Sequence, residues 1–166
     1  MKAKILSPNE TVCEYVTEIM VMQNDPGVKI SSMPIFAYGV PYLIFKTKKG
    51  ILGTKNTGYL TLFGQTITPT YLTIEDDFII IVYYFKPFAL LTLFRTSAKE
   101  LTDNPTDLLL VNSRYGRELQ ERLLNSVSVN DMIELLDHYI YSLIVESKVQ
   151  TQLIYATTRF AYRSII

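Results

Sequence analysis

The longest hydrophobic run of the chain covers residues 78–85, Phe-Ile-Ile-Ile-Val-Tyr-Tyr-Phe, and stops at Lys86 and Pro87. Eight apolar or aromatic residues in a row, most of them β-branched or aromatic, favour a strand buried on both faces over a helix. Side chains alternate along a strand, so we expect Tyr83 and Phe85 on one face and Tyr84 on the other. The remaining elements are expected to pack around this strand.

Shorter apolar segments separated by turn residues precede this run. The spacing of apolar residues from Val12 to Ile19 predicts a short helix after Pro8 and Asn9. The segments that follow predict short strands at residues 19–22, 35–38, 42–45, 59–65 and 71–74. Short strands separated by turns at this spacing indicate a β-sandwich or a small barrel and argue against alternating βαβ units.

Helical spacing takes over after Pro87. Leu90, Leu91 and Phe94 predict a short helix, and Leu119, Leu123 and Leu124 form one apolar face of another that begins near Ser113. Residues 128–131, Ser-Val-Asn-Asp, resemble a capping box that opens a helix over residues 128–147, and residues 149–166 predict a further helix. The end of the sequence carries no helix-stop signal, so we expect the native chain to continue past Ile166.

The helix predicted over residues 128–147 carries an apolar stripe at three-to-four spacing. We expect part of this stripe to stay exposed after packing, and therefore to form a homodimer interface. Its members are Ile133, Leu136, Ile140, Leu143 and Ile144.

Composition narrows the class of protein. The 166 residues are enough for one compact unit, with a strand-rich part at residues 1–95 and a helical part at 96–166. Sixteen basic and sixteen acidic residues balance, so this chain lacks the excess positive charge that DNA binding normally needs. A single cysteine, together with the lack of a signal peptide or membrane-length apolar run, predicts a cytoplasmic protein without a membrane partner.

Candidate catalytic and metal-binding groups are sparse. His138, the only histidine, lies off the apolar stripe of its helix and is interpreted as a surface residue, which argues against a metal site. Cys13 is interpreted as a buried, inert thiol. The run Glu75-Asp76-Asp77 and the group Lys46, Lys48 and Lys49 are interpreted as solvated turns, and no phosphate-binding glycine motif occurs. We therefore expect no catalytic residue and no cofactor.

Aromatic residues on the predicted strands are the remaining candidates for a binding site. Tyrosine combines apolar area with one hydroxyl group, and those side chains that point inward would line either a packed core or a small-molecule pocket. The candidates are Tyr38, Tyr42, Phe45, Phe63, Gln65, Tyr83 and Phe85.

Four short motifs in order resemble the N-terminal sensor domain of AraC-type bacterial transcription regulators, in a variant frequent in Bacteroidetes-like genomes. The motifs are Pro41-Tyr-Leu-Ile-Phe45, Phe63-Gly64-Gln65, Phe85-Lys86-Pro87 and Glu118-Leu119-x3-Leu123-Leu124. The resemblance covers nearly the whole chain. Three positions depart from the pattern, namely Met20, Lys46 and Phe88, and they bear on the ligand more than on the fold.

This resemblance implies an α+β fold, a cupin-like antiparallel β-barrel followed by C-terminal helices. It also implies binding of a small-molecule effector, dimerisation, and contact with DNA only through a helix-turn-helix domain that is absent from this chain. Alternative functions are a metal-free barrel enzyme, either an isomerase or a lyase that uses a buried tyrosine or carboxylate, and a stand-alone small-molecule-binding protein. A purely structural dimerisation module with a filled barrel is a third.

Overall fold

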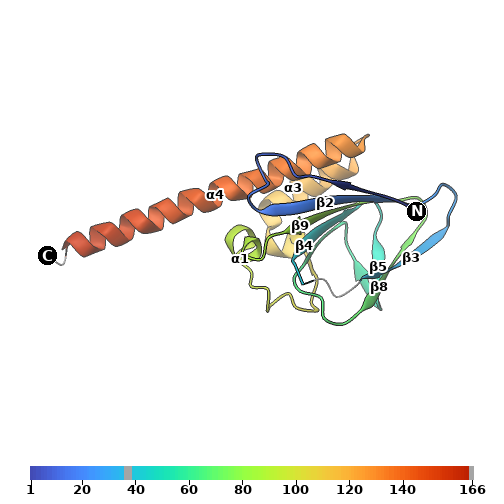
Figure 1. Ribbon diagram of the computed structural model, residues 1–166, viewed down its shortest axis with the longest axis horizontal. Helices are drawn as coiled ribbons and strands as arrows, with labels where there is room; N and C mark the ends of the chain where they lie inside the picture. The colour runs from blue at the N-terminus through green and yellow to red at the C-terminus, as the bar shows by residue number, and fades with distance from the viewer. Residues whose placement is uncertain (36–38, 165–166) are drawn as a thin grey trace.

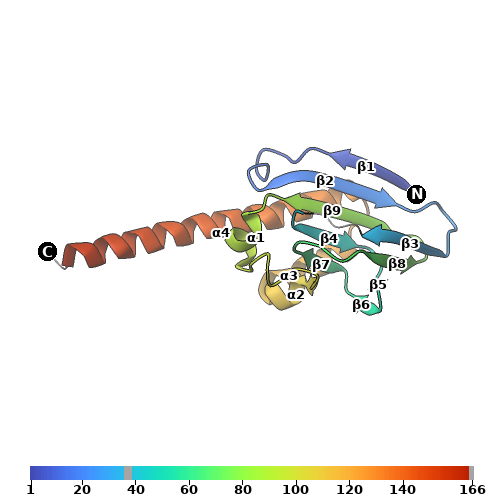
Figure 2. The ribbon, with the colours of Figure 1, turned by 60° about the horizontal axis from the view of Figure 1, so that its bottom comes forward.

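Two antiparallel sheets form the body of the molecule. The computed structural model describes residues 1–35 and 39–164, apart from the side chains of residues 162 and 164. Figure 2 shows the two sheets, whose strands pair in the following orders. The six-stranded sheet contains β1 (Lys2–Leu6), β2 (Val16–Gln23), β9 (Ile79–Phe85), β4 (Tyr42–Lys46), β7 (Leu60–Phe63) and β10 (Thr106–Asp107). The four-stranded sheet contains β3 (Ile30–Ile35), β8 (Thr70–Glu75), β5 (Gly50–Leu52) and β6 (Lys55–Thr57).

The sheets do not close into a barrel. Among the described residues no strand of one sheet pairs with a strand of the other, so each sheet keeps two edges. The expected α+β class with antiparallel strands and C-terminal helices is confirmed, but the cupin-like barrel is not. β10 belongs to the segment 96–166 and pairs with β7, so the six-stranded sheet draws on both of the predicted parts of the chain.

Strand β9 is buried on both faces, as the hydrophobic run predicts. Ile80, Val82 and Tyr84 belong to the core between the two sheets. Ile81, Tyr83 and Phe85 belong to the core on the opposite face, where the helices pack. β9 pairs with β2 on one side and β4 on the other, and this position explains why its sequence shows no polar alternation.

Four helices follow the strand-rich part and cover the outer face of the six-stranded sheet (Figure 1). They are α1 (Ala89–Phe94), α2 (Leu108–Val111), α3 (Ser113–Leu124) and α4 (Val129–Ser164). Leu119 and Leu123 of α3 are buried as predicted, whereas Leu124 is exposed. α1 is also confirmed, with Leu90 and Phe94 buried and Leu91 exposed.

Residues 129–164 form one continuous helix instead of the two predicted from sequence. The start is as expected, because the Ser128 hydroxyl oxygen accepts a hydrogen bond from the Asp131 backbone N–H at 3.1 Å. No proline or glycine interrupts the helix at residues 147–149, so the two apolar patterns join without a break. The second half of α4 projects away from the sheets and places the C-terminus far from the body (Figure 1).

The N-terminal segment differs most from its prediction. Residues 10–15 form turns in place of a helix, although two bonds of helical type are present, from Cys13 N to Asn9 O and from Val16 N to Val12 O. The Asn9 side chain accepts the Thr11 N–H at 2.9 Å, and Val16 already pairs with β9. The predicted strand at 19–22 is confirmed as part of β2, while the exposed edge strand β1 was not predicted.

A buried tyrosine connects β9 to α4. The Tyr83 hydroxyl donates to the Asp137 carboxylate at 2.8 Å and lies 3.2 Å from the Ile133 carbonyl oxygen. The other Asp137 oxygen accepts a hydrogen bond from the Asn9 side chain at 2.8 Å. Burial raises the pKa of the Asp137 carboxyl above its usual range, Tyr83 opposes this effect, and Glu134 adds to it. One carboxylate thus ties α4 to the sheet and to the N-terminal turn.

We predict that Tyr83→Phe lowers the free energy of unfolding by about 1–3 kcal/mol, because Asp137 then loses its donor inside the fold. The same change should raise the pKa of Asp137 further, since the hydrogen bond that favours its charged form is gone. Urea unfolding measures the first effect and carboxyl NMR titration the second. Tyr71→Phe, at an exposed position of β8, is the control and should change stability by less than about 0.5 kcal/mol.

Candidate functional site

The predicted aromatic site residues divide between the two faces of the six-stranded sheet. Tyr42 and Phe63 lie between the sheets and stack with ring centroids 4.6 Å apart. Phe45, Tyr83 and Phe85 lie on the opposite face and pack beneath the helices. Gln65 is exposed after β7, and Tyr38 lies outside the described residues. The described members of the set therefore do not form one pocket, and among them only Tyr42 lines the cavity described next.

An apolar cavity of about 280 Å³ lies between the two sheets. Four methionines form much of its wall, namely Met1, Met20 and Met22 near the edge of the six-stranded sheet and Met33 on β3. The rest of the lining comes from β9, β4, β8 and the end of β3, through Ile80, Val82, Tyr84, Tyr42, Ile44, Leu72, Pro34 and Ile35. We call this space the inter-sheet cavity.

Among the described residues, the inter-sheet cavity has one charged group at its wall, the N-terminal ammonium of Met1, which is paired with the Asp25 carboxylate. Its described lining contains no Asp, Glu, Lys, Arg or His side chain. Polar character comes from tyrosine hydroxyls, one of which, on Tyr42, lies 3.4 Å from the Thr66 hydroxyl. Met20, Met22 and Ile35 are half-buried, whereas Val82, Ile80 and Leu72 are fully buried. The cavity therefore has its floor on β9 and β8 and its opening at the methionine side.

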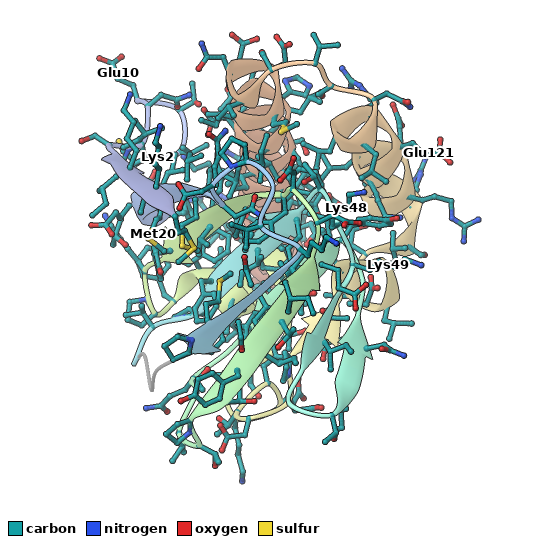
Figure 3. The ribbon with its side chains drawn as sticks, turned by 90° about the vertical axis from the view of Figure 1, so that its right-hand side faces the viewer. Lys2, Glu10, Met20, Lys48, Lys49 and Glu121 are labelled. Carbon is teal, nitrogen blue, oxygen red and sulfur yellow. The ribbon has the colours of Figure 1, made fainter. Side chains whose placement is uncertain are left out.

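Sequence reasoning missed the methionines. Met20 and Met22 stand two residues apart on one strand, so they share a face, and that spacing was the available signal. Met33 is brought beside them only by the packing of the second sheet, which no local pattern reveals. Figure 3 shows the labelled Met20 beneath the six-stranded sheet, on the side of the second sheet.

The same inter-sheet face becomes polar toward β7 and β10. Across the sheet, Met22 lies opposite Ile80 and Ile80 opposite Lys46. In the neighbouring row, Ile44 lies opposite Thr61 and Thr61 opposite Asp107. A gradient from thioethers to charged and hydroxyl groups thus runs across the space between the sheets.

Lys46 corrects the prediction of a solvated turn at residues 46–49. Its side chain is 1% exposed, and its ammonium donates to the Thr57 hydroxyl oxygen at 3.0 Å. Thr57 in turn donates to the Gly50 carbonyl oxygen at 3.2 Å. Burial lowers the pKa of Lys46 to about 8, and the negative charge of Asp107 opposes this shift. The nearby Thr61 hydroxyl is buried without a hydrogen-bond partner among the described residues.

We predict that Lys46→Met stabilises the protein by roughly 2–3 kcal/mol at neutral pH, because the pKa falls from 10.5 to about 8 on folding and the buried charge is unfavourable. Between pH 8 and 10.5 the folded state holds Lys46 neutral while the unfolded chain is still protonated. The stability of the unsubstituted protein should therefore rise with pH across this window, and the advantage of Lys46→Met should shrink.

Urea unfolding at pH 7, 9 and 10.5 measures this dependence. Lys48→Met is the matched control, since Lys48 is exposed and its substitution removes the same charge from solvent. An advantage of Lys46→Met that does not change with pH would contradict the role assigned to the buried ammonium.

A shallow groove of about 720 Å³ lies between α3 and α4 and includes Tyr115, Arg122, Tyr141 and Val145. From this groove, apolar side chains follow one side of α4 at every fourth residue, as far as Leu153. We define the outer stripe of α4 as Tyr141, Val145, Val149 and Leu153, all of which are exposed.

The dimer residues expected from sequence occupy a different face of α4. Leu136, Ile140, Leu143 and Ile144 are buried in the core beneath the sheet, and Ile133 is partly buried against it. These side chains therefore offer little surface to a second copy. These residues pack inside the chain because the central strands of the six-stranded sheet have an apolar outer face that needs a cover.

The other chemical candidates mostly lie on the surface. Residues 75–77 form an exposed turn between β8 and β9, Lys48 and Lys49 are exposed, and His138 is exposed on α4, as predicted. Cys13 is exposed as well, which corrects its interpretation as a buried thiol. Its position in an exterior turn follows from the N-terminal segment being turns in place of a helix.

Within the described residues, no helix combines the length and the apolar character needed to cross a lipid bilayer.

Comparison with known families gives one match. Residues 4–107 match the model of DUF6597, a domain of unknown function. This range runs from β1 to the last residue of β10, so it takes in the strands of both sheets and the walls of the inter-sheet cavity except Met1. No curated protein matches the chain in sequence. Because the match spans well over half of its 166 residues, the chain belongs to the DUF6597 family.

Proposed function

We propose that this chain is the ligand-sensing and dimerisation domain of an AraC-type transcription regulator. The observation that carries the proposal is the double role of β9. Val82 and Tyr84 line the inter-sheet cavity, while Tyr83 between them donates a hydrogen bond to Asp137 of α4. A molecule bound between the sheets would therefore act on the same strand that holds the long helix.

Family membership supports this proposal. DUF6597 is generally associated with the N-terminal part of AraC-type regulators. The sequence resemblance points the same way, since two of its motifs lie at or beside β9: residues 41–45 run into β4, which pairs with β9, and residues 85–87 begin at the last residue of β9. The balanced charge of the chain suits a domain that leaves contact with DNA to another part of the protein.

The proposed mechanism is a shift between two arrangements of α4. A ligand that fits the cavity better in one arrangement favours that arrangement by its difference in affinity for the two. Asp137 would couple the position of β9 to that of α4, because one of its oxygens accepts a hydrogen bond from Tyr83 and the other accepts one from Asn9. A change in the position of Tyr83 would alter the packing at the base of α4. No catalytic residue takes part in this mechanism.

Dimerisation is assigned to the outer stripe of α4. Leu153 is 62% exposed on a helix segment that projects away from the sheets. An apolar stripe that stays exposed along a helix is typical of a surface that binds a partner. A second copy of the chain supplies the same stripe, and two such helices are able to pack face to face.

We predict that Leu153→Asp converts a dimer into a monomer of 19.0 kDa in sedimentation equilibrium, because a carboxylate would be buried in the helix pair. Thr151→Asp is the matched control. It adds the same charge two residues away, on the opposite side of the helix, and should leave the dimer intact. A dimeric Leu153→Asp variant, or a monomeric unsubstituted chain, would assign the stripe another role.

We also predict that the native reading frame encodes, beyond the codon for Ile166, a basic segment with two helix-turn-helix units. Sequencing the source gene tests this expectation. A stop codon at that point would remove the DNA-binding half, and a stand-alone small-molecule-binding protein would become the better hypothesis.

A further inference from the structure

We propose that the inter-sheet cavity takes an uncharged, apolar molecule of about 10 to 15 non-hydrogen atoms that carries an aromatic ring, an inference that rests on the cavity being the sensor's ligand site. The chemical class follows from the size of the cavity, from its charge and from the type of side chain that lines it.

The size of the cavity limits the ligand. An enclosed apolar cavity of roughly 150 Å³ in another protein accepts benzene, which has six non-hydrogen atoms. The inter-sheet cavity holds about 280 Å³. Scaling by volume gives roughly eleven non-hydrogen atoms, and the half-buried methionines at the opening leave room for a few more. A two-ring aromatic compound fits this range, whereas a nucleotide or a disaccharide does not.

The charge of the walls excludes an ionised ligand. A carboxylate or ammonium group that enters an apolar site without a partner loses several kcal/mol of hydration. The described lining offers no charged side chain to replace that hydration, and the N-terminal ammonium of Met1 is already paired with the Asp25 carboxylate. Lys46 is a buried cation in the same cross-strand row as Met22 and Ile80, but its ammonium donates a hydrogen bond to Thr57 of β6 and Lys46 is not part of the lining. Glu18, two residues before Met20 on β2, also lies outside the lining.

The methionines indicate an aromatic partner and an adaptable wall. Unbranched thioether side chains change rotamer at little cost, and their sulfur atoms make favourable contacts with aromatic rings. Met20, Met22 and Met33 approach the cavity from two different sheets, so they can close on a flat molecule from both sides. The floor adds the Tyr42 and Tyr84 rings, whose centroids are 5.6 Å apart. A planar apolar ligand thus meets sulfur at the entrance and aromatic rings at the inner wall.

The methionines also supply the test, because four of the five in the chain line the cavity. The fifth, Met132 of α4, lies in the core on the other face of the six-stranded sheet. In protein labelled with ¹³C at the methionine methyl groups, 2-naphthol is titrated and methyl NMR spectra are recorded at pH 7. The methyl signals of Met20, Met22 and Met33 should shift to saturation, while that of Met132 stays in place. Individual Met→Leu variants assign the signals, since this exchange conserves volume.

Two matched comparisons sharpen the result. The charged analogue 2-naphthoate should bind at least tenfold more weakly than 2-naphthol, which carries the same rings. Val82→Phe and Met22→Phe should each weaken the binding of 2-naphthol by filling the cavity from the floor and from the entrance. An unchanged Met132 signal shows that each variant is folded, and Met132→Leu, in the other core, should bind 2-naphthol as the unsubstituted protein does.

The outcomes separate this inference from the proposed function. Equal or tighter binding of 2-naphthoate would overturn the uncharged class and leave a sensor for an anion. If neither compound moves the cavity signals while Leu153→Asp still breaks the dimer, the ligand class is wrong and the dimerisation role stands. Binding of 2-naphthol by a protein whose reading frame lacks a DNA-binding half would support the ligand class and overturn the regulator.

Discussion

The burial of β9 on both faces is the constraint on which the rest of the structure depends. A strand with apolar side chains in both directions needs a cover on each side of its sheet. The four-stranded sheet covers one side and the helices cover the other. The two cores therefore share this one strand, with Val82 and Tyr84 facing one core and Tyr83 the other.

Prediction from sequence succeeded where one local pattern decides the structure. The apolar run from Phe78 to Phe85 fits a buried strand and no other element. The start of α4 is set by the hydrogen bond from the Asp131 N–H to the Ser128 hydroxyl. It failed where distant contacts decide. The apolar spacing from Val12 to Ile19 fits a helix, yet pairing of Val16 and Ile19 with β9 converts the second half of that segment to strand. The burial of the residues expected at a dimer interface has a related reason, because the periodicity of α4 identifies an apolar face without identifying what covers it.

The candidate site was the harder part for the same reason. Alternation correctly separates Tyr83 from Tyr84, but it does not say which face carries an empty space and which is filled. The inter-sheet cavity depends on how β3 lies against β2 and β9, and the contribution of Met33 follows from that packing alone. Lys46 shows the opposite error. A lysine close in sequence to two other lysines is expected to be exposed to solvent. Lys46 is instead buried between the sheets, because it belongs to β4 and lies opposite Ile80.

The uninterrupted course of α4 makes it a lever. From Asp137 to Ser164 the helix is roughly 40 Å long, at 1.5 Å per residue. A tilt of about five degrees at the end held by Tyr83 displaces the far end by roughly 3 Å, without any deformation of the helix itself. Sub-ångström adjustments between the sheets thus become movements on the scale of a side chain at the tip. Two separate helices with a break near residue 148 would not transmit a tilt at the base to the C-terminal end.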